Sequence, residues 1–197
     1  SHIEDLKAFN INYDNFYTTH SEENKFLSEM IFSRLQEKDL IEEKEIEQLF
    51  DTEKNLFLSD RYVKGTCPSC NAKEQYGDNC ESCSSAYSAI DLIDPVSVLS
   101  DSKPEIRKSI HLFFKLSKLR KSINEWLETS KVPKQAVNKL SEWTEGEIKD
   151  WDISRDGPYF GFEIPGYPNK FFYVWMDAPI GYLASHKNYL DRLGKSE

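Results

Sequence analysis

The sequence of 197 residues predicts an α/β protein in which a mostly parallel sheet is interrupted by a cysteine-rich insertion. Two Cys-x-x-Cys pairs lie near the middle of the chain, at 67–70 and 80–83. Before them, residues 22–37 carry apolar side chains at helical spacing. After them, residues 171–175 form a near-continuous apolar run, which is typical of a strand buried on both faces of a parallel sheet. A ribbon between two parts of one sheet domain follows from this order.

Taken in order, the first elements predicted are a strand and a helix. Residues 9–13 alternate apolar and polar side chains as a short strand does. Thr19 is the predicted N-cap, with Glu22 completing a capping box. The helix over 22–37 then presents one apolar face to a core, formed by Phe26, Leu27, Met30, Ile31 and Leu35. An extended segment is predicted to begin at residues 40–41, followed by a charged run over 42–49.

The later elements follow the same periodicities. Strands are predicted over 87–93, over 159–164 and in the segment that contains His111, Phe113 and Phe114. Helices are predicted over 123–130, 134–146 and 182–193, and a tight turn or helix start over 116–119. The buried side of the helix over 134–146 is predicted to carry Ala136, Val137, Leu140 and Trp143. The polar stretch over 152–156 is predicted to be a loop.

The four cysteines predict a structural metal site. Cys67 and Cys70 form one turn and Cys80 and Cys83 the other, while the chain reverses at 77–79, where Gly and Asn tolerate positive φ. Four thiolates brought to one point bind Zn²⁺ as a closed tetrahedron, with metal–sulfur distances near ~2.3 Å. A closed site leaves no open position for chemistry, so the predicted zinc is structural. Its binding would supply on the order of 10 kcal/mol of local folding energy.

Two other readings of the cysteines remain open. Two disulfides would suit a small secreted domain, but paired Cys-x-x-Cys motifs have metal-site spacing, and no signal peptide is visible. Iron is the minor alternative to zinc, because it also accepts four thiolates.

Composition and charge limit the classes of partner. The net charge is -9, with 39% hydrophobic and 13% aromatic residues, and no apolar run is long enough to span a bilayer. We therefore expect a soluble, cytoplasmic protein that binds neither membrane nor DNA. Residues 22–53 carry eleven acidic and four basic side chains, whereas 103–139 carry ten basic and three acidic ones. The basic segment is either a solvated face or a contact for RNA phosphates.

Seven stretches together resemble the methionyl-tRNA synthetases, a class I family, in the bacterial form with a single zinc. They cover nearly the whole chain in order: residues 13–16, 19–24, 60–68, 75–81, 151–156, 158–165 and 172–182. One small departure is Ser84, where the family usually has Gly after the fourth cysteine. This changes the flexibility of the turn and not a metal ligand.

The resemblance implies a fold and an activity. Residues 1–47 and 154–197 would be parts of a Rossmann-like catalytic domain, and 48–153 the connective peptide with its zinc knuckle. The family activates methionine with ATP to methionyl-adenylate and transfers the methionine to its tRNA. Methionine, ATP and tRNA(Met) are thus the partners implied for the full enzyme.

The resemblance also assigns site residues. Trp175, Ala178, Pro179 and Tyr182 match positions that help form the methionine pocket, and Arg155 matches a catalytic residue linked to the reacting phosphates. The assignment is physically reasonable, since flat aromatic walls suit a thioether and a guanidinium stabilises charge on phosphate oxygens.

Neither nucleotide-binding signature of class I synthetases, the His-Ile-Gly-His type or the Lys-Met-Ser-Lys-Ser type, occurs in these residues. We therefore expect an internal fragment of the ligase that is inactive alone. The alternative is an independent zinc ribbon that binds RNA through 103–139 without catalysis. The stretch over 151–182 favours the fragment, because a bare ribbon has no use for a buried apolar run followed by Ala-Pro-Ile-Gly-Tyr.

Overall fold

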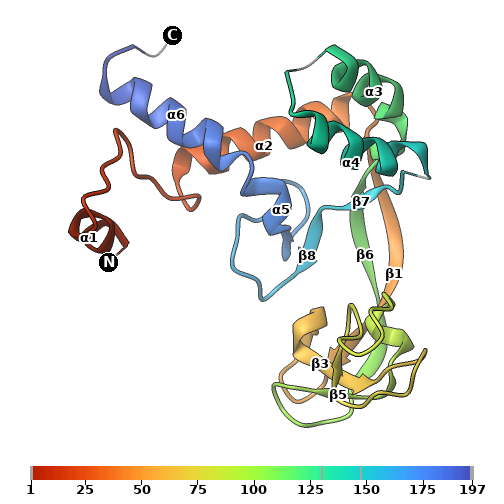
Figure 1. Cartoon of the computed structure of the whole chain (residues 1–197). Coiled ribbons are helices and arrows are strands. Elements are labelled where there is room, and N and C mark those ends of the chain that lie inside the picture. The colour runs from red at the N-terminus through yellow and green to blue at the C-terminus, as the bar shows by residue number, and fades with distance from the viewer. Residues whose placement is uncertain (1, 130, 147, 196–197) are drawn as a thin grey trace. The chain divides into compact units, whose positions relative to one another are not determined.

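A computed structural model describes residues 2–129, 131–146 and 148–195, except for the side chains of 142–145. The chain divides into two compact units (Figure 1). Unit 1 contains residues 1–42, 112–154 and 160–197, and unit 2 contains residues 43–111 and 155–159. Each unit has its own hydrophobic core, so each is described by itself.

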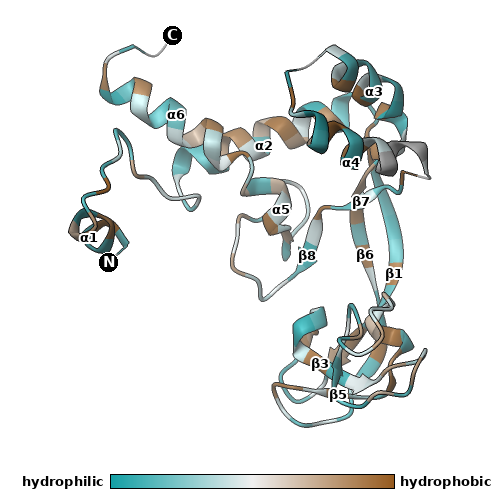
Figure 2. Cartoon of the chain, viewed as in Figure 1, coloured by the Kyte–Doolittle hydropathy of each residue, from teal (hydrophilic) through white to brown (hydrophobic). Residues whose placement is uncertain are grey.

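Unit 1 is built around two long helices. The helices α2 (Glu22–Glu37) and α6 (Gly181–Arg192) pack against each other, and the short helix α5 (Val174–Asp177) also contacts α2. Apolar and polar residues intermix along both long helices (Figure 2). Eight buried side chains form the core: Phe32, Leu112, Ile153, Phe162, Ile164, Phe172, Met176 and Ile180. Unit 1 therefore depends on contacts between segments that are far apart in the sequence.

The helix predicted over 22–37 is confirmed, and Leu27, Ile31 and Leu35 pack against the core as predicted, but its cap and its most buried residues differ from the prediction. Ser21, not Thr19, caps the helix, because its side chain accepts a hydrogen bond from the Asn24 backbone N–H at 3.2 Å. The most buried stripe is Asn24, Ser28 and Phe32, while Phe26 is 57% exposed. Apolar spacing alone missed this stripe because two of its three residues are polar.

The remaining elements of unit 1 are short. They are α1 (His2–Ala8), η3 (Leu116–Leu119), α3 (Arg120–Thr129), α4 (Lys134–Glu145), β7 (Trp151–Asp152) and β9 (Lys170–Phe172). The predicted helix start at 116–119 and the three later helices are confirmed to within a few residues, although Ser130 lies outside the described residues. Ala136 is exposed, contrary to the prediction, and the Trp143 side chain is among those not described.

Unit 2 contains a three-stranded sheet in the order β4-β3-β5, with antiparallel pairings. These strands are β3 (Val63–Thr66), β4 (Gln75–Tyr76) and β5 (Ile93–Ser97), with the short helices η1 (Asp60–Tyr62) and η2 (Ala89–Asp91) beside them in sequence. The core of unit 2 is Leu49, Leu58, Val63 and Leu92. It is smaller than the core of unit 1.

A four-stranded sheet in the order β2-β1-β6-β7 includes the two longest strands of the chain. These are β1 (Ile41–Asp51) and β6 (Glu105–Phe114), and β2 (Leu56–Phe57) pairs with β1 in antiparallel register, Phe50 opposite Phe57. The strand β7 also pairs in antiparallel register, with β6, and Phe113 lies opposite Asp152. A third sheet contains β9 and β8 (Ser154–Asp156).

The mixed α/β class and the cysteine-rich insertion are confirmed, but several predicted elements are wrong. Residues 9–13 are irregular, residues 87–93 contain the short helix η2, and residues 152–156 lie mostly in strands. Between 159 and 164 there is only one isolated bridge, from Glu163 to Phe171. The predicted strand over 171–175 ends at Phe172, and Trp175 lies in the helix α5.

These errors have a common physical cause. An apolar run shows that side chains are buried, but it does not distinguish a strand from a short buried helix. The direction of pairing is also not encoded in the run: the pairings of β1 with β2, β3 with β4, β3 with β5 and β6 with β7 are all antiparallel. Within the described residues, no helix is both long enough and apolar enough to cross a bilayer.

Candidate functional site

The two cysteine turns have nearly the same backbone hydrogen bonds. In the first, the Cys67 N–H donates to the Ala72 carbonyl and the Asn71 N–H donates back to the Cys67 carbonyl. In the second, the Cys80 N–H donates to the Ser85 carbonyl and the Ser84 N–H to the Cys80 carbonyl. Asn71 and Ser84 hold equivalent positions with φ of 61° and 59°. The chain thus builds the same turn twice.

The turns bring four sulfur atoms together. The Sγ atoms of Cys67, Cys70, Cys80 and Cys83 all lie within 4.8 Å of one another. The distance between the Sγ atoms of Cys67 and Cys83 is 3.9 Å, and that between the Sγ atoms of Cys70 and Cys80 is 3.6 Å. A thiolate tetrahedron around an ion at ~2.3 Å has edges of about 3.8 Å. All four cysteines are free and these separations far exceed a disulfide bond, so the disulfide reading is wrong.

The electrostatics of the cluster also fit a cation. Hydrogen bonds from the side chain and backbone of Ser85 lower the pKa of Cys83 to about 6. The backbone N–H of Ala72 lowers the pKa of Cys70, but the neighbouring Cys83 thiol, burial and the other sulfurs together raise it to about 12. The Cys83 thiolate therefore forms readily, whereas a negative charge on Cys70 beside it is unfavourable. A divalent cation would remove this repulsion, and all four sulfurs are placed to bind it.

Backbone donors complete the second layer of the site. The Ser69 N–H donates to the Cys67 Sγ and the Cys83 N–H to the Cys80 Sγ, both at 3.4 Å. Cys67 and Cys80 are buried, whereas Cys70 and Cys83 are exposed. Because sulfur occupies all four corners, such a site is suited to holding the ribbon together and not to activating water.

A separate cavity in unit 1 contains the predicted methionine-site residues. Trp175, Ala178, Pro179 and Tyr182 all line one cavity of about 800 Å³. Trp175 is 62% exposed and Tyr182 is 83% exposed, so both rings present open faces. These residues come from α5, the turn after it and the start of α6.

The opposite wall of this cavity is the segment 13–19, for which the sequence predicted no part in a binding site. This segment contributes Tyr13, Phe16, Tyr17 and Thr19, among others. Asn15 fastens the segment to α6, because its Nδ2 donates to the Ser185 carbonyl at 2.8 Å and its Oδ1 accepts from Arg192 at 2.7 Å. Two stretches of the family resemblance, 13–16 and 19–24, overlap this wall and were the available signal.

A hydrogen-bonded pair supports the same wall. The Tyr17 hydroxyl donates to Glu23 at 2.6 Å, and Glu23 also accepts from Asn188 at 2.9 Å. The Tyr17 bond lowers the pKa of Glu23, and the same carboxylate raises the pKa of Tyr17. Glu23 therefore stays ionised while it links α2, the segment 13–19 and α6.

Asp177, directly before the cavity residue Ala178, is a buried carboxyl. Burial raises its pKa, although backbone N–H groups and the nearby His20 act in the opposite direction. Its Oδ1 has no hydrogen-bond partner in the described part of the chain. Desolvation is the largest influence on this carboxyl, and it disfavours the charged form.

Arg155 belongs to unit 2, on the strand β8. Its neighbour Asp156 accepts hydrogen bonds through Oδ2 from the Ser109 hydroxyl at 2.8 Å and from the buried His111 at 3.0 Å. Gln48 donates to the same oxygen at 3.2 Å. Burial and the Asp78 charge raise the pKa of Asp60, while Arg155 lowers it. The hydrogen bonds of Asp156 therefore hold the backbone next to Arg155 in place. The sequence did not predict this hydrogen-bond network around Asp156.

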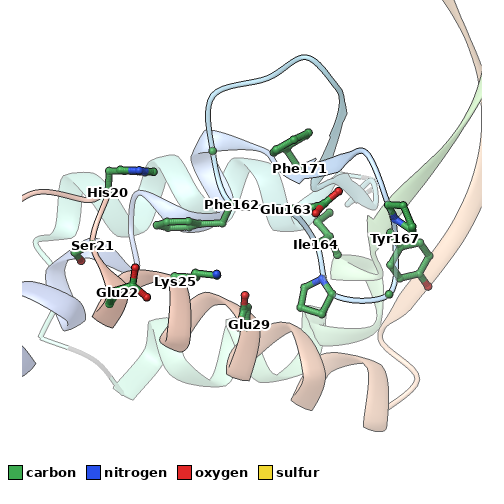
Figure 3. A pocket seen from close by; sticks show the side chains of 14 residues that line it. His20, Ser21, Glu22, Lys25, Glu29, Phe162, Glu163, Ile164, Tyr167 and Phe171 are labelled. Atoms are coloured by element: carbon green, nitrogen blue, oxygen red, sulfur yellow. The ribbon is translucent and has the colours of Figure 1, made fainter.

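A second cavity of about 770 Å³ lies between α2 and the segment 161–171 (Figure 3). Glu22, Lys25 and Glu29 project into it from α2, and Phe162 lies opposite. His20 stacks on Phe162 with ring centroids 5.4 Å apart. None of the sequence-predicted site residues lines this cavity.

Three solved structures with a similar fold come from one synthetase. Two structures of Mycobacterium tuberculosis methionyl-tRNA synthetase with methionyl-adenylate match with a TM-score of 0.60 and 17% sequence identity. Each match covers 93% of this chain and 32% of the other. The apo form of that enzyme matches with a TM-score of 0.56 and 17% identity, over 91% and 32%. This likeness shows the fold, and the chain spans about a third of the length of the proteins it matches.

The sequence matches a family model over its whole length. That model describes tRNA synthetases class I (M) and covers residues 1–197. The cysteine cluster and the aromatic cavity therefore belong to a member of the class I tRNA synthetases (M), the family to which this chain belongs.

Proposed function

We propose that this chain is the amino-acid-binding part of a methionine–tRNA ligase, together with its structural zinc ribbon. The full enzyme would join methionine to ATP as methionyl-adenylate, release pyrophosphate and transfer the methionyl group to tRNA(Met). It would act in the cytoplasm, without membrane or DNA partners. One observation carries the proposal: the four residues predicted from the family resemblance line a single cavity.

The walls of that cavity suit a methionine side chain. Trp175 and Tyr182 offer open aromatic faces, and Ala178 and Pro179 add a small apolar surface between them. A thioether sulfur gains about 0.3–1.5 kcal/mol from each aromatic contact. Leucine lacks the sulfur and is branched, so this cavity would favour the straight thioether.

Arg155 is proposed to act on the phosphates. When the methionine carboxylate attacks the α-phosphate of ATP, negative charge grows on the phosphate oxygens, and a guanidinium stabilises it through charge-assisted hydrogen bonds. The anchored neighbour Asp156 would keep the backbone of Arg155 in place. The four cysteines would hold zinc, which supplies structural cross-linking and no step of the reaction.

This polypeptide alone is proposed to be inactive. The sequence contains neither of the two signatures through which class I synthetases bind the nucleotide. A cavity for methionine without a complete ATP site cannot support adenylate formation.

Methionine-dependent ATP–pyrophosphate exchange tests the proposal. An intact synthetase that contains this chain should exchange pyrophosphate, and the 197-residue chain should not. Arg155→Ala in the intact enzyme should lower kcat by about 100-fold or more, since removing one preorganised charge donor has an effect of that order. Arg61→Ala, an exposed arginine in η1, is the matched control. Exchange by the chain alone would refute its inactivity, and an intact enzyme without exchange would refute the function.

The alternative of an RNA-binding ribbon has weaker support. Several bases in the segment 103–139 already pair with acids: Lys108 with Glu45, Lys115 and Lys118 with Asp39, Arg107 with Glu105, and Lys121 with Glu125. In these ion pairs, acidic side chains already neutralise the basic groups that RNA phosphates would need to contact. Salt-sensitive tRNA binding by the chain, with no preference for tRNA(Met), would instead favour the alternative.

A further inference from the structure

We propose that Asn24 is a positioning residue that sets the width of the amino-acid cavity by tying its two walls together. The inference rests on the proposed function, because it concerns the same cavity. Asn24 lies in the first turn of α2 and is not itself a lining residue. It would act on methionine only through the walls it holds.

The side-chain amide of Asn24 bonds to both walls at once. Its Nδ2 donates to the carbonyl of Thr19 at 2.8 Å, and to the carbonyl of Asp177 at 3.2 Å. Thr19 ends the wall formed by 13–19, and Asp177 directly precedes Ala178 and Pro179 on the other wall. The two N–H bonds of one rigid amide therefore fix the distance between two chain segments that are over 150 residues apart.

The burial of Asn24 argues that the amide is retained for this link. Its side chain is 0% exposed, and its Oδ1 has no hydrogen-bond partner among the described residues. A buried amide with an unsatisfied oxygen is a poor choice for packing alone, since leucine has a similar shape and no polar atom. The two donated bonds distinguish asparagine from leucine at this position.

The walls approach each other closely near this link. A Cβ added to Gly181 would lie 2.7 Å from the Cγ2 of Thr19, which is too close for two carbon atoms. The close approach of Thr19 to Gly181 prevents the walls from moving closer together. The two Asn24 hydrogen bonds prevent the walls from moving apart. The cavity between them should therefore have a fixed width.

A change in this width should alter methionine binding more than any other step. Dispersion contacts lose a quarter to half of their strength when a gap of ~0.5–1 Å opens. A thioether held between Trp175 and Tyr182 on one wall and Tyr13 or Phe16 on the other would lose contacts with one of them. The proposed function assigns the ATP phosphates to Arg155 and not to these walls, so the KM for ATP should not change.

The test uses the intact synthetase with Asn24→Asp and Asn24→Ala. Both variants lose the two N–H donors, and Asn24→Asp keeps the shape. We expect the KM for methionine in pyrophosphate exchange to rise about tenfold, with the KM for ATP and kcat within about twofold of wild type. Ser28→Ala is the matched control, because Ser28 is equally buried one turn further along α2 and makes no such link. Its kinetics should equal those of wild type.

A second pair of variants tests the same width without removing the amide. Gly181→Ala should raise the KM for methionine, because the new methyl group pushes against Thr19. Adding Thr19→Ser removes the opposing Cγ2 and should return the KM toward the wild-type value. This pair decides the question if the Asn24 variants do not fold by circular dichroism.

Two results would overturn the inference. The first is an unchanged KM for methionine in folded Asn24 variants, or equal rises for methionine and ATP. The second is a Gly181→Ala defect that Thr19→Ser does not relieve. A wild-type enzyme without methionine-dependent exchange would instead refute the proposed function, so the two failures are distinguishable.

Discussion

The cysteine cluster and the aromatic cavity are built in opposite ways. All four sulfur atoms of the cluster come from one stretch, 67–83, and each turn closes through hydrogen bonds within six residues. The walls of the cavity come from 13–19 and 175–189, and hydrogen bonds of Asn15, Glu23 and Asn24 join them across that separation. A local pattern defines the first site, and long-range packing defines the second.

The difference shows what each site requires. The cluster needs correct spacing, and as a metal site it would also need a cation that overcomes the repulsion between thiolates, so it would form whenever its own ribbon folds. The cavity needs the core of unit 1 to be complete, since its walls rest on α2, α5 and α6. Perturbations should therefore separate the two sites, and four experiments test that separation.

Loss of the metal should have the largest effect, and it should be confined to unit 2. Cys80→Ser removes a buried sulfur atom of the cluster and should abolish metal binding, with loss of on the order of 10 kcal/mol of local folding energy. Amide hydrogen exchange should accelerate over 63–97 and remain slow over 181–192. Ser69→Ala, which changes an exposed side chain in the first cysteine turn, is the control. Equal acceleration in both regions would show that the sites are not independent.

Removing an aromatic wall should have the next largest effect, and only on the cavity. Trp175→Ala deletes an aromatic face worth roughly 1–3 kcal/mol of apolar contact, so the Kd for methionine in the intact enzyme should rise about tenfold or more. Isothermal titration calorimetry measures the Kd, and elemental analysis should still find the metal. Trp126→Ala changes a similarly exposed tryptophan on α3 and should leave the Kd unchanged.

Acid should weaken unit 2 through Asp51. Burial raises the pKa of this carboxyl, but hydrogen bonds from Ser100, Ser97 and two backbone N–H groups lower it to about 2 from its ordinary 3.8. A depressed folded-state pKa adds stability above pH 4, which is lost as the pH falls from about 4 to 2. The free energies of unfolding of wild type and Asp51→Asn, measured by chemical denaturation, should converge as the pH falls over that range. Asp101→Asn, at an exposed carboxyl, should retain the wild-type profile.

The smallest effect should come from the second cysteine turn. Ser84 has φ of 59°, a conformation that glycine adopts without strain. Ser84→Gly should stabilise unit 2 by less than about 1 kcal/mol, because glycine also gains entropy in the unfolded chain. Asn71→Gly, at the equivalent position of the first turn, should gain less, since asparagine tolerates this region. Thermal unfolding measures the change in stability. A clear loss of stability in Ser84→Gly would contradict this interpretation of the turn.

Local sequence signals predicted the local features well. The Cys-x-x-Cys spacing located the sulfur cluster, and apolar periodicity located α2 from Glu22 to Glu37 and α6 to within one residue. These features depend on neighbours within a few positions, so periodicity and turn chemistry are sufficient to find them.

Features that depend on distant contacts were not accessible in this way. Residues 152–156 have the composition of a polar loop, yet β7 pairs with β6. The Ser154 Oγ also accepts a hydrogen bond from the Leu112 backbone N–H at 2.9 Å. Trp175 sits in an apolar run but lies in a short helix, because the chain turns after Phe172 toward α6. Asn24 has no local feature that marks it, and only the fold shows that its amide joins two walls.

Hydrogen exchange of the intact synthetase with and without methionine tests the cavity most directly. Methionine should slow amide exchange over both 13–19 and 175–189, the two stretches that form the walls of this cavity. Slowing confined to other segments, with both of these unchanged at saturating methionine, would contradict the assignment.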